Sequence, residues 1–161
     1  MKEIELTQGK VAIVDDEDFE WLGQWKWYAS NNKYTWYARR TDYSGWKHQT
    51  IRMHRAILEY HGYDLTGLSV DHINHNGIDN RLKNLRPATQ SQNQHNQRPM
   101  RGICEYKGVY WDSVHNKWRV QITANHHQIH LGLFDDKKTA AKIYNRAAVK
   151  LFGEFACLNK I

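Results

Sequence analysis

Residues 70–96 read VDHINHNGIDNRLKNLRPATQSQNQHN. This segment places a carboxylate beside an imidazole, at Asp71 and His72, and follows them with asparagines at Asn84 and Asn93. Oxygen ligands suit a hard divalent cation, and an imidazole titrates close enough to neutrality to take a proton from water. The combination predicts hydrolysis of a phosphodiester with one metal ion.

The same segment predicts two strands and a helix. Ser69–Ile73 has the pattern of a strand, Asn74–Asn80 that of a polar loop, and Arg86–Ala88 that of a returning strand. Either Thr89 or Ser91 can accept a hydrogen bond from the first N–H groups of a short helix that carries Asn93. We therefore expect a ββα unit over residues 66–97.

The segment resembles the HNH nuclease motif, with Asp71-His72 at its first position, Asn84 at the middle and Asn93 at the last. The resemblance implies that Asp71 and Asn93 bind the metal and that His72 is the general base. Neighbours on a strand alternate faces, so His72 points away from Asp71. Asn84 is expected to tie the loop through backbone hydrogen bonds and, by family analogy, to orient His72. Mg²⁺ fits two oxygen ligands best and Mn²⁺ is possible.

Residues 1–65 predict a small, mainly β region. Short strands are expected at 11–14, 25–30, 34–40 and 49–53, and a helix at 54–60. Most of the tryptophans here are expected in the core, because a small domain with few aliphatic residues needs large side chains. Basic residues alternate with the aromatics and could extend a DNA footprint; the candidates are Arg39, Arg40 and Arg52.

Residues 106–161 predict three strands, at 107–111, 117–123 and 128–131, followed by a helix from Lys137 to Phe152. The expected apolar stripe of this helix is Ala140, Tyr144, Ala147, Ala148 and Leu151. Nearly the whole segment resembles an AP2 DNA-binding domain. The resemblance lies in the motifs YKGVY, Trp118, HLGLFD, NRAA and GEFACLN, which follow one another in that order. In that family a three-stranded sheet reads the major groove and the helix supports it.

The AP2 resemblance and strand alternation give a set of candidate DNA contacts. They are Lys107, Tyr110, Trp111, Arg119, Gln121, Thr123, Gln128 and His130. Plant AP2 domains have arginines where this chain has Tyr110, Thr123 and Gln128, so their guanine-rich preference does not transfer. Residues 98–105 read as a basic linker, whose Arg98 and Arg101 could follow the DNA backbone.

Composition agrees with a polyanionic partner. The 161 residues carry a net charge of +6, with the basic excess in the C-terminal half. Cys104 and Cys157 form no C-x-x-C pair, which argues against a zinc site and fits a reducing cytoplasm. Neither a membrane-spanning stretch nor a secretory signal is expected from the sequence.

Together these patterns predict an α+β protein with an N-terminal region (1–65), an HNH module (66–97), a linker (98–105) and an AP2-like domain (106–161). Both resemblances occur together in homing endonucleases of phages and mobile introns. We expect a metal-dependent, site-specific endonuclease that acts as a monomer on double-stranded DNA and nicks one strand. The alternatives are a DNA-binding regulator with an inactive nuclease site and, less favoured, an RNA-processing nuclease. The sequence leaves open the target site, the strand cut and the host.

Overall fold

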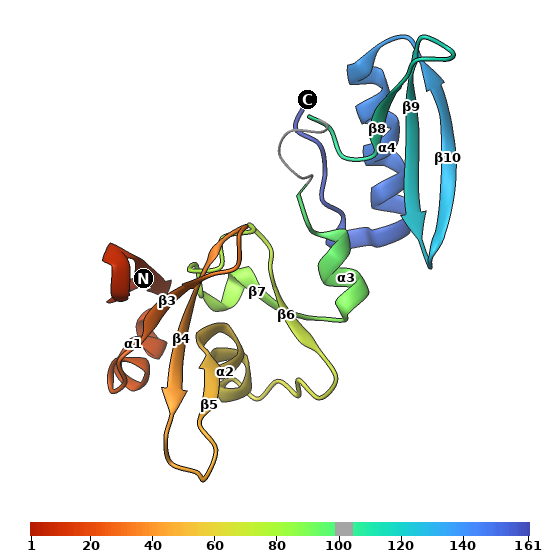
Figure 1. Cartoon of the computed structure of the whole chain (residues 1–161). Helices are drawn as coiled ribbons and strands as arrows, with labels where there is room; N and C mark the ends of the chain where they lie inside the picture. The colour runs from red at the N-terminus through yellow and green to blue at the C-terminus, as the bar shows by residue number, and fades with distance from the viewer. Residues whose placement is uncertain (99–104) are drawn as a thin grey trace. The chain divides into compact units, whose positions relative to one another are not determined.

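The computed structural model describes residues 1–98 and 105–161. The chain forms two units, residues 1–93 and 94–161, and each contains helices and small antiparallel sheets (Figure 1). The predicted mixture of α and β structure is therefore confirmed. Most of the expected linker, including Arg101 and Cys104, lies outside the described residues.

The first unit opens with a hairpin and continues through a three-stranded sheet into a helix. In chain order its elements are β1 (Lys2–Glu5), β2 (Val11–Val14), α1 (Asp16–Gly23), β3 (Tyr28–Asn31), β4 (Trp36–Asp42), β5 (Gln49–Arg52) and α2 (Met53–Tyr60). Strand β4 is the central strand of the sheet β3-β4-β5. The sequence predicted β2 to β5 and α2 within a few residues. It did not predict β1, whose Lys-Glu-Ile-Glu sequence buries only Ile4.

A strand pair completes the first unit. Strand β6 (Ser69–His72) runs antiparallel to β7 (Leu85–Ala88), with the 3-10 turn η2 (Leu82–Asn84) before β7 and the short helix α3 (Gln90–His95) after it. Thr89 caps α3, because its hydroxyl accepts from the backbone N–H of Gln92 and its own N–H donates to the Gln92 side chain. The expected two strands and following helix are therefore present.

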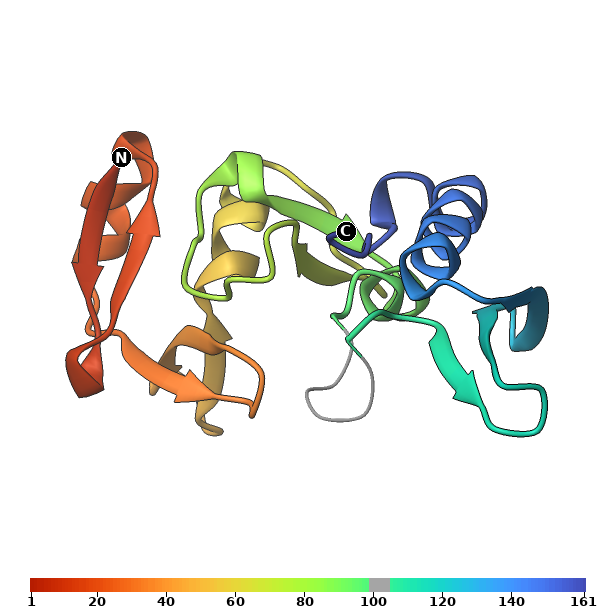
Figure 2. The ribbon, with the colours of Figure 1, turned by 90° about the horizontal axis from the view of Figure 1, so that it is seen from above.

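One hydrophobic core serves the whole first unit. It joins Leu22 of α1, Met53 and Ile57 of α2, and Val70 and Leu85 of the β6–β7 pair. Figure 2 shows α2 beside that pair. The sequence predicted a boundary between residues 65 and 66, whereas the structure packs both sides of it into this core.

The second unit is a three-stranded antiparallel sheet with one long helix against it (Figure 1). Its elements are β8 (Val109–Asp112), β9 (Lys117–Ala124), β10 (His127–Phe134), α4 (Lys137–Phe152) and the turn η3 (Gly153–Phe155). Asp136 caps α4, as its carboxylate accepts from the N–H of Thr139, and Gly153 ends it. Both helix ends lie where the sequence predicted them.

Small residues let α4 lie close to its sheet. Ala140, Ala141, Tyr144 and Ala148 are buried against Val109, Val120 and Ile122. Leu151, which was expected in this stripe, is 43% exposed, and Ala141 takes part instead. No helix in the described part of the chain is both long enough and apolar enough to cross a membrane.

Candidate active site

Asp71 and Arg86 form a buried ion pair across the β6–β7 ladder. The two residues are direct partners in the antiparallel register, and Arg86 Nε and Nη2 lie 2.9 and 2.7 Å from Asp71 Oδ2. The side chains are 4% and 11% exposed, respectively. The guanidinium supplies the positive charge that a buried carboxylate needs when no metal is bound.

His72, the next residue on β6, is held by Asn80. The imidazole is buried, and its Nε2 lies 3.2 Å from the side-chain oxygen of Asn80. Asn80 has no solvent exposure; its backbone N–H donates to the carbonyl of Ile13, and its Nδ2 approaches the sulfur of Met53. Because the amide nitrogen faces the sulfur, the amide oxygen faces the ring and accepts from Nε2–H. Nδ1 is then the ring nitrogen that carries the lone pair.

Burial also sets the charge of this histidine. Removal from water lowers the pKa of His72, and the Asn80 contact and the charges of Asp71 and Asp79 only partly oppose that effect. The ring is therefore neutral near pH 7. A neutral ring is the state that a general base needs.

His54 and Tyr37 pack around His72. The ring centroids of His54 and His72 are 5.0 Å apart, and that of Tyr37 lies 5.6 and 5.8 Å from them. His54 comes from the first turn of α2 and Tyr37 from the middle of β4, so this cluster joins three elements. Neither His54 nor Asn80 could be predicted as part of this cluster from the sequence, since their roles depend on contacts between segments far apart in the chain.

Asn84 closes the loop between β6 and β7. Its side-chain oxygen accepts from the backbone N–H of Asn74, and its Nδ2 donates to the carbonyl of Asp79. These are the backbone hydrogen bonds expected of this residue. The side chain that accepts the hydrogen bond from the His72 ring, however, is that of Asn80.

The loop itself is tied to neighbouring strands. The N–H of Gly77 donates to Thr35, and a Cβ added at Gly77 would collide with the carbonyl of Trp36 and the ring of Tyr37. Only glycine allows this approach. Asp79, also buried, binds Arg81 through two nitrogens and accepts from Asn74.

The expected metal ligands are both oxygen donors. Asp71 offers a carboxylate and Asn93, on α3, a half-buried carboxamide whose side chain makes no hydrogen bond within the described residues. Such a pair fits a hard cation that keeps water or phosphate oxygens as its other ligands. Within residues 1–98 and 105–161, no three His, Cys, Asp or Glu side chains gather as a metal cluster.

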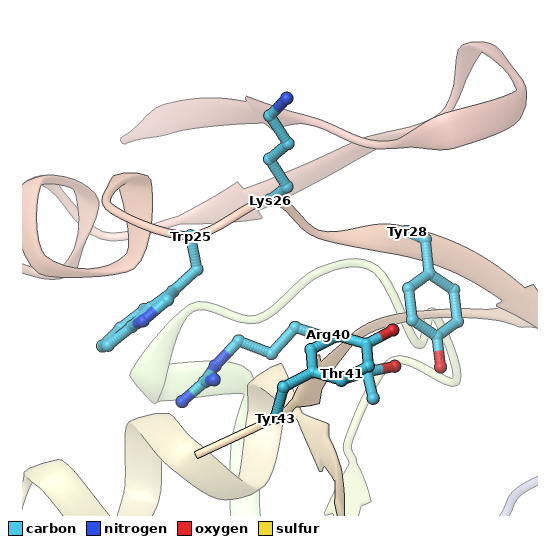
Figure 3. Close-up of a pocket in the computed structure, with 6 residues that line it drawn as sticks. All are labelled: Trp25, Lys26, Tyr28, Arg40, Thr41 and Tyr43. Atoms are coloured by element: carbon cyan, nitrogen blue, oxygen red, sulfur yellow. The ribbon is translucent and has the colours of Figure 1, made fainter. Parts of the chain in front are cut away.

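The basic candidates of the first unit lie on both faces of the sheet β3-β4-β5. Arg39 and Arg52 are direct cross-strand partners on the Tyr37 face of β4. Arg40 points to the other face, where its guanidinium lies 4.3 Å from the ring centroid of Trp25. Figure 3 shows Arg40 and Trp25 among the residues that line a hollow. The hollow has a volume of about 280 Å³, and none of the predicted nuclease residues lines it. Arg40 therefore packs against the ring of Trp25. Both residues are distant in the sequence from Asp71 and His72.

In the second unit, strand alternation places most of the candidate DNA contacts on one face. Arg119, Gln121 and Thr123 of β9 share a face, and the register adds Tyr110 of β8 with Gln128 and His130 of β10. All except Gln121 are exposed. The cross-strand partner of Trp111 is Trp118, so Trp111 lies on the opposite face.

Two further basic candidates have different surroundings. Lys107 is half-buried, and its Nζ donates to the backbone carbonyls of His95 and Gln97, at 2.7 and 2.6 Å. Burial lowers its pKa. Arg98 is exposed at the edge of the described segment.

Comparisons with known proteins find the profile of a nuclease family and a relative named as a nuclease. The profile of the HNH endonuclease family matches residues 52–95, which span α2, β6, β7 and α3. An uncharacterized HNH endonuclease of Acanthamoeba polyphaga mimivirus is 35% identical over 133 residues, or 81% of this chain and 69% of the relative. Protein 3.8 of Escherichia phage T7 is 33% identical over 91 residues, or 56% of this chain and 74% of that protein.

A third relative is of another kind. An ethylene-responsive transcription factor-like protein of Arabidopsis thaliana is 43% identical over 54 residues. The aligned residues make up 34% of this chain and only 21% of the plant protein. The predicted resemblance to HNH nucleases is confirmed by the family profile over residues 52–95 and by the mimivirus relative. With the mimivirus relative aligned along most of both chains and the family profile covering the His72 region, this chain belongs to the HNH endonuclease family.

Proposed function

We propose that the protein is a site-specific DNA endonuclease of the homing type, with one divalent metal ion and His72 as general base. The observation that carries the proposal is the pairing of His72 Nε2 with the buried Asn80 oxygen at 3.2 Å. It leaves Nδ1 as the basic nitrogen of a neutral ring. Asp71 is the neighbour of His72 on β6, and its carboxylate suits a metal ion.

Proton transfer is the task of His72 in this scheme. Nδ1 takes a proton from water, the water oxygen forms a bond to phosphorus, and the bond from phosphorus to the leaving sugar oxygen breaks. Asn80 keeps the second ring proton on Nε2 and supports the positive charge that the ring acquires. The leaving sugar oxygen takes a proton from bulk water, and the ring releases its own proton to bulk water, which returns it to the neutral state after each turnover.

Asp71 and Asn93 would hold the metal ion, which supplies charge stabilisation at the phosphate and its leaving oxygen. HNH nucleases generally depend on divalent metals, and the two oxygen donors favour Mg²⁺, with Mn²⁺ a possible substitute. Arg86 balances the charge of Asp71 and fixes the direction of its carboxylate. Loop residues 74–84, held by Asn84, keep Asn80 against the ring.

The second unit would supply sequence recognition as an AP2-like domain. Its three-stranded sheet, its supporting helix and the partial match to the plant transcription factor-like protein support this assignment. On the exposed face, Arg119 and Gln121 can make bidentate contacts with bases. The two units differ in fold, so we expect a monomer along an asymmetric target and a nick in one strand.

Plasmid nicking tests the proposal. Supercoiled DNA that carries a selected target should become open circular with Mg²⁺ and remain intact with excess chelator. Asp71→Ala should lose both metal binding and cleavage, whereas Asn93→Asp, which keeps an oxygen ligand, should retain part of each. Cleavage at full rate in excess chelator would refute the metal mechanism.

A DNA-binding regulator is the second candidate. The buried ion pair between Arg86 and Asp71 favours it, because the guanidinium occupies one oxygen of the expected metal ligand. The two functions are separated by the same assay, since a regulator binds the target without nicking it in any divalent metal.

A further inference from the structure

A basic hollow lies beside the candidate active site in the first unit. It has a volume of about 370 Å³ and is lined by Arg52, His54, Arg55, residues 67–70 and Gln90. Residues 69 and 70 belong to β6, the strand that carries Asp71 and His72. His54 packs on His72, so the hollow adjoins the general base.

The positive charge at this hollow is not balanced within the described residues. Arg39 and Arg52 face each other across β4 and β5, and no carboxylate of residues 1–98 or 105–161 pairs with either. Like charges in direct cross-strand register destabilise a sheet. By contrast, Arg55 is neutralised by Glu59, and its guanidinium holds the backbone carbonyls of Leu65 and Leu68.

Two buried polar atoms near the hollow have no hydrogen-bond partner among the described residues. One is Nδ1 of His54, a residue that is 5% exposed, and the other is Nε of Arg39. Arg39 is the direct cross-strand partner of Arg52, and Arg52 lines the hollow together with His54. A buried polar atom without a partner costs free energy that a ligand can recover.

The start of helix α2 adds backbone donors. Arg52 is the N-cap of this eight-residue helix, makes no side-chain capping bond, and is followed by no acidic residue in the first turn. The first N–H groups of a helix are unsatisfied and attract anions. Basic residues at this end oppose the helix dipole unless an anion lies between them and the helix.

We propose that this hollow binds a second phosphodiester of the DNA strand, next to the one that is cut. Arg52 and Arg39 supply its counter-charge, His54 a ring hydrogen bond, and the first turn of α2 its backbone donors. The inference rests on the proposed nuclease function for the identity of the polymer. A phosphate held here would fix the position of its neighbour against His72.

NMR titration with a dinucleotide tests the site without cleavage. Thymidylyl-thymidine, which has one phosphodiester, should shift the backbone amides of residues 53–55 and the Nε signal of Arg39 in the full chain. Its methylphosphonate analogue, which is neutral, should not. Arg52→Gln should weaken the response at least several-fold, whereas Lys26→Gln, which removes an exposed charge elsewhere, should leave it unchanged.

The two ligands and two variants give decisive outcomes. Equal shifts with the charged and neutral dinucleotides, or equal weakening by Arg52→Gln and Lys26→Gln, would overturn the proposal. Shifts at residues 53–55 in a protein that nicks no DNA would keep the phosphate site and reject the nuclease function. The two failures are thus distinguishable.

A second measurement places the phosphate on the strand. In a cleavable duplex, one methylphosphonate next to the scissile bond should slow wild-type cleavage, and Arg52→Gln should be insensitive to the same substitution. A methylphosphonate can be placed at each neighbouring phosphate in turn. If every such substitution slows Arg52→Gln as much as the wild type, Arg52 binds none of these phosphates.

Discussion

His72 Nε2 lies 3.2 Å from the side-chain oxygen of Asn80, and Asn80 is completely buried. The contact fixes which ring nitrogen can accept a proton. Asn80→Leu keeps the volume approximately but removes the acceptor, so the ring can adopt the other tautomer. We expect kcat to fall about 10- to 100-fold, the loss typical of groups that orient a metal-ligating imidazole, with little change in DNA affinity.

Asn80→Asp is the matched control for this prediction, because it keeps an oxygen acceptor at the same position. It should retain more activity than Asn80→Leu, and ¹⁵N NMR of the imidazole should show Nε2 protonated in wild type. An Nδ1-protonated ring in the wild-type protein would contradict the assignment of the basic nitrogen.

Arg86 is expected to stabilise the protein when no metal is bound. Arg86→Leu leaves the Asp71 carboxylate buried without a counter-charge, and breaking a buried pair in this way costs about 3–5 kcal/mol. Urea unfolding measures the loss. Added Mg²⁺ should recover more stability in the variant than in wild type, since the metal replaces the missing charge; equal recovery would show that Asp71 does not bind it.

Acid should destabilise the fold through His54. Burial, and then the neighbouring His72 and Arg52, hold the pKa of His54 well below its ordinary value. Above the ordinary pKa of about 6.5 neither state is protonated at His54. Below it, the unfolded chain binds a proton that the folded ring resists, so stability falls with decreasing pH.

Urea midpoints at pH 7.5 and pH 5 measure this effect. His54→Gln should lose less stability between the two pH values than wild type, whatever its stability at pH 7.5. An identical loss in both proteins would mean that His54 does not resist protonation in the folded state.

Arg119 tests the recognition face of the second unit. If its exposed side chain reads a base, Arg119→Ala should weaken target binding by about 1–3 kcal/mol and relax the preference at one position. If it contacts only phosphate, affinity should fall on all sequences and the salt slope should drop by about one unit. Binding titrations at several salt concentrations distinguish the two results, and no change in either quantity would reject this face.

The elements that the sequence predicted well are determined by residues within or next to them. Helix α4 runs from Lys137 to Phe152 as predicted, because Asp136 caps it and Gly153 ends it. Strands β6 and β7 followed from the apolar and polar pattern around Asp71 and Arg86. In each case the deciding residues lie within a few positions of the element they shape.

Long-range contacts explain what the sequence could not predict. Asn80 looked like one of several loop asparagines, and its role depends on the carbonyl of Ile13 and the sulfur of Met53. His54 gains its place from packing against β4 and β6. Nothing in a single sequence states which distant segments will meet.

His72 is expected to perform the proton transfer of DNA hydrolysis, and plasmid nicking measures its contribution. Supercoiled plasmid carrying the target is incubated with wild type and with His72→Ala at concentrations that give equal DNA occupancy. Wild type should produce open circles at a rate first order in bound enzyme, and the variant should be slower by about 10²–10⁴-fold. Open circles formed at the wild-type rate by His72→Ala would show that His72 is not the general base.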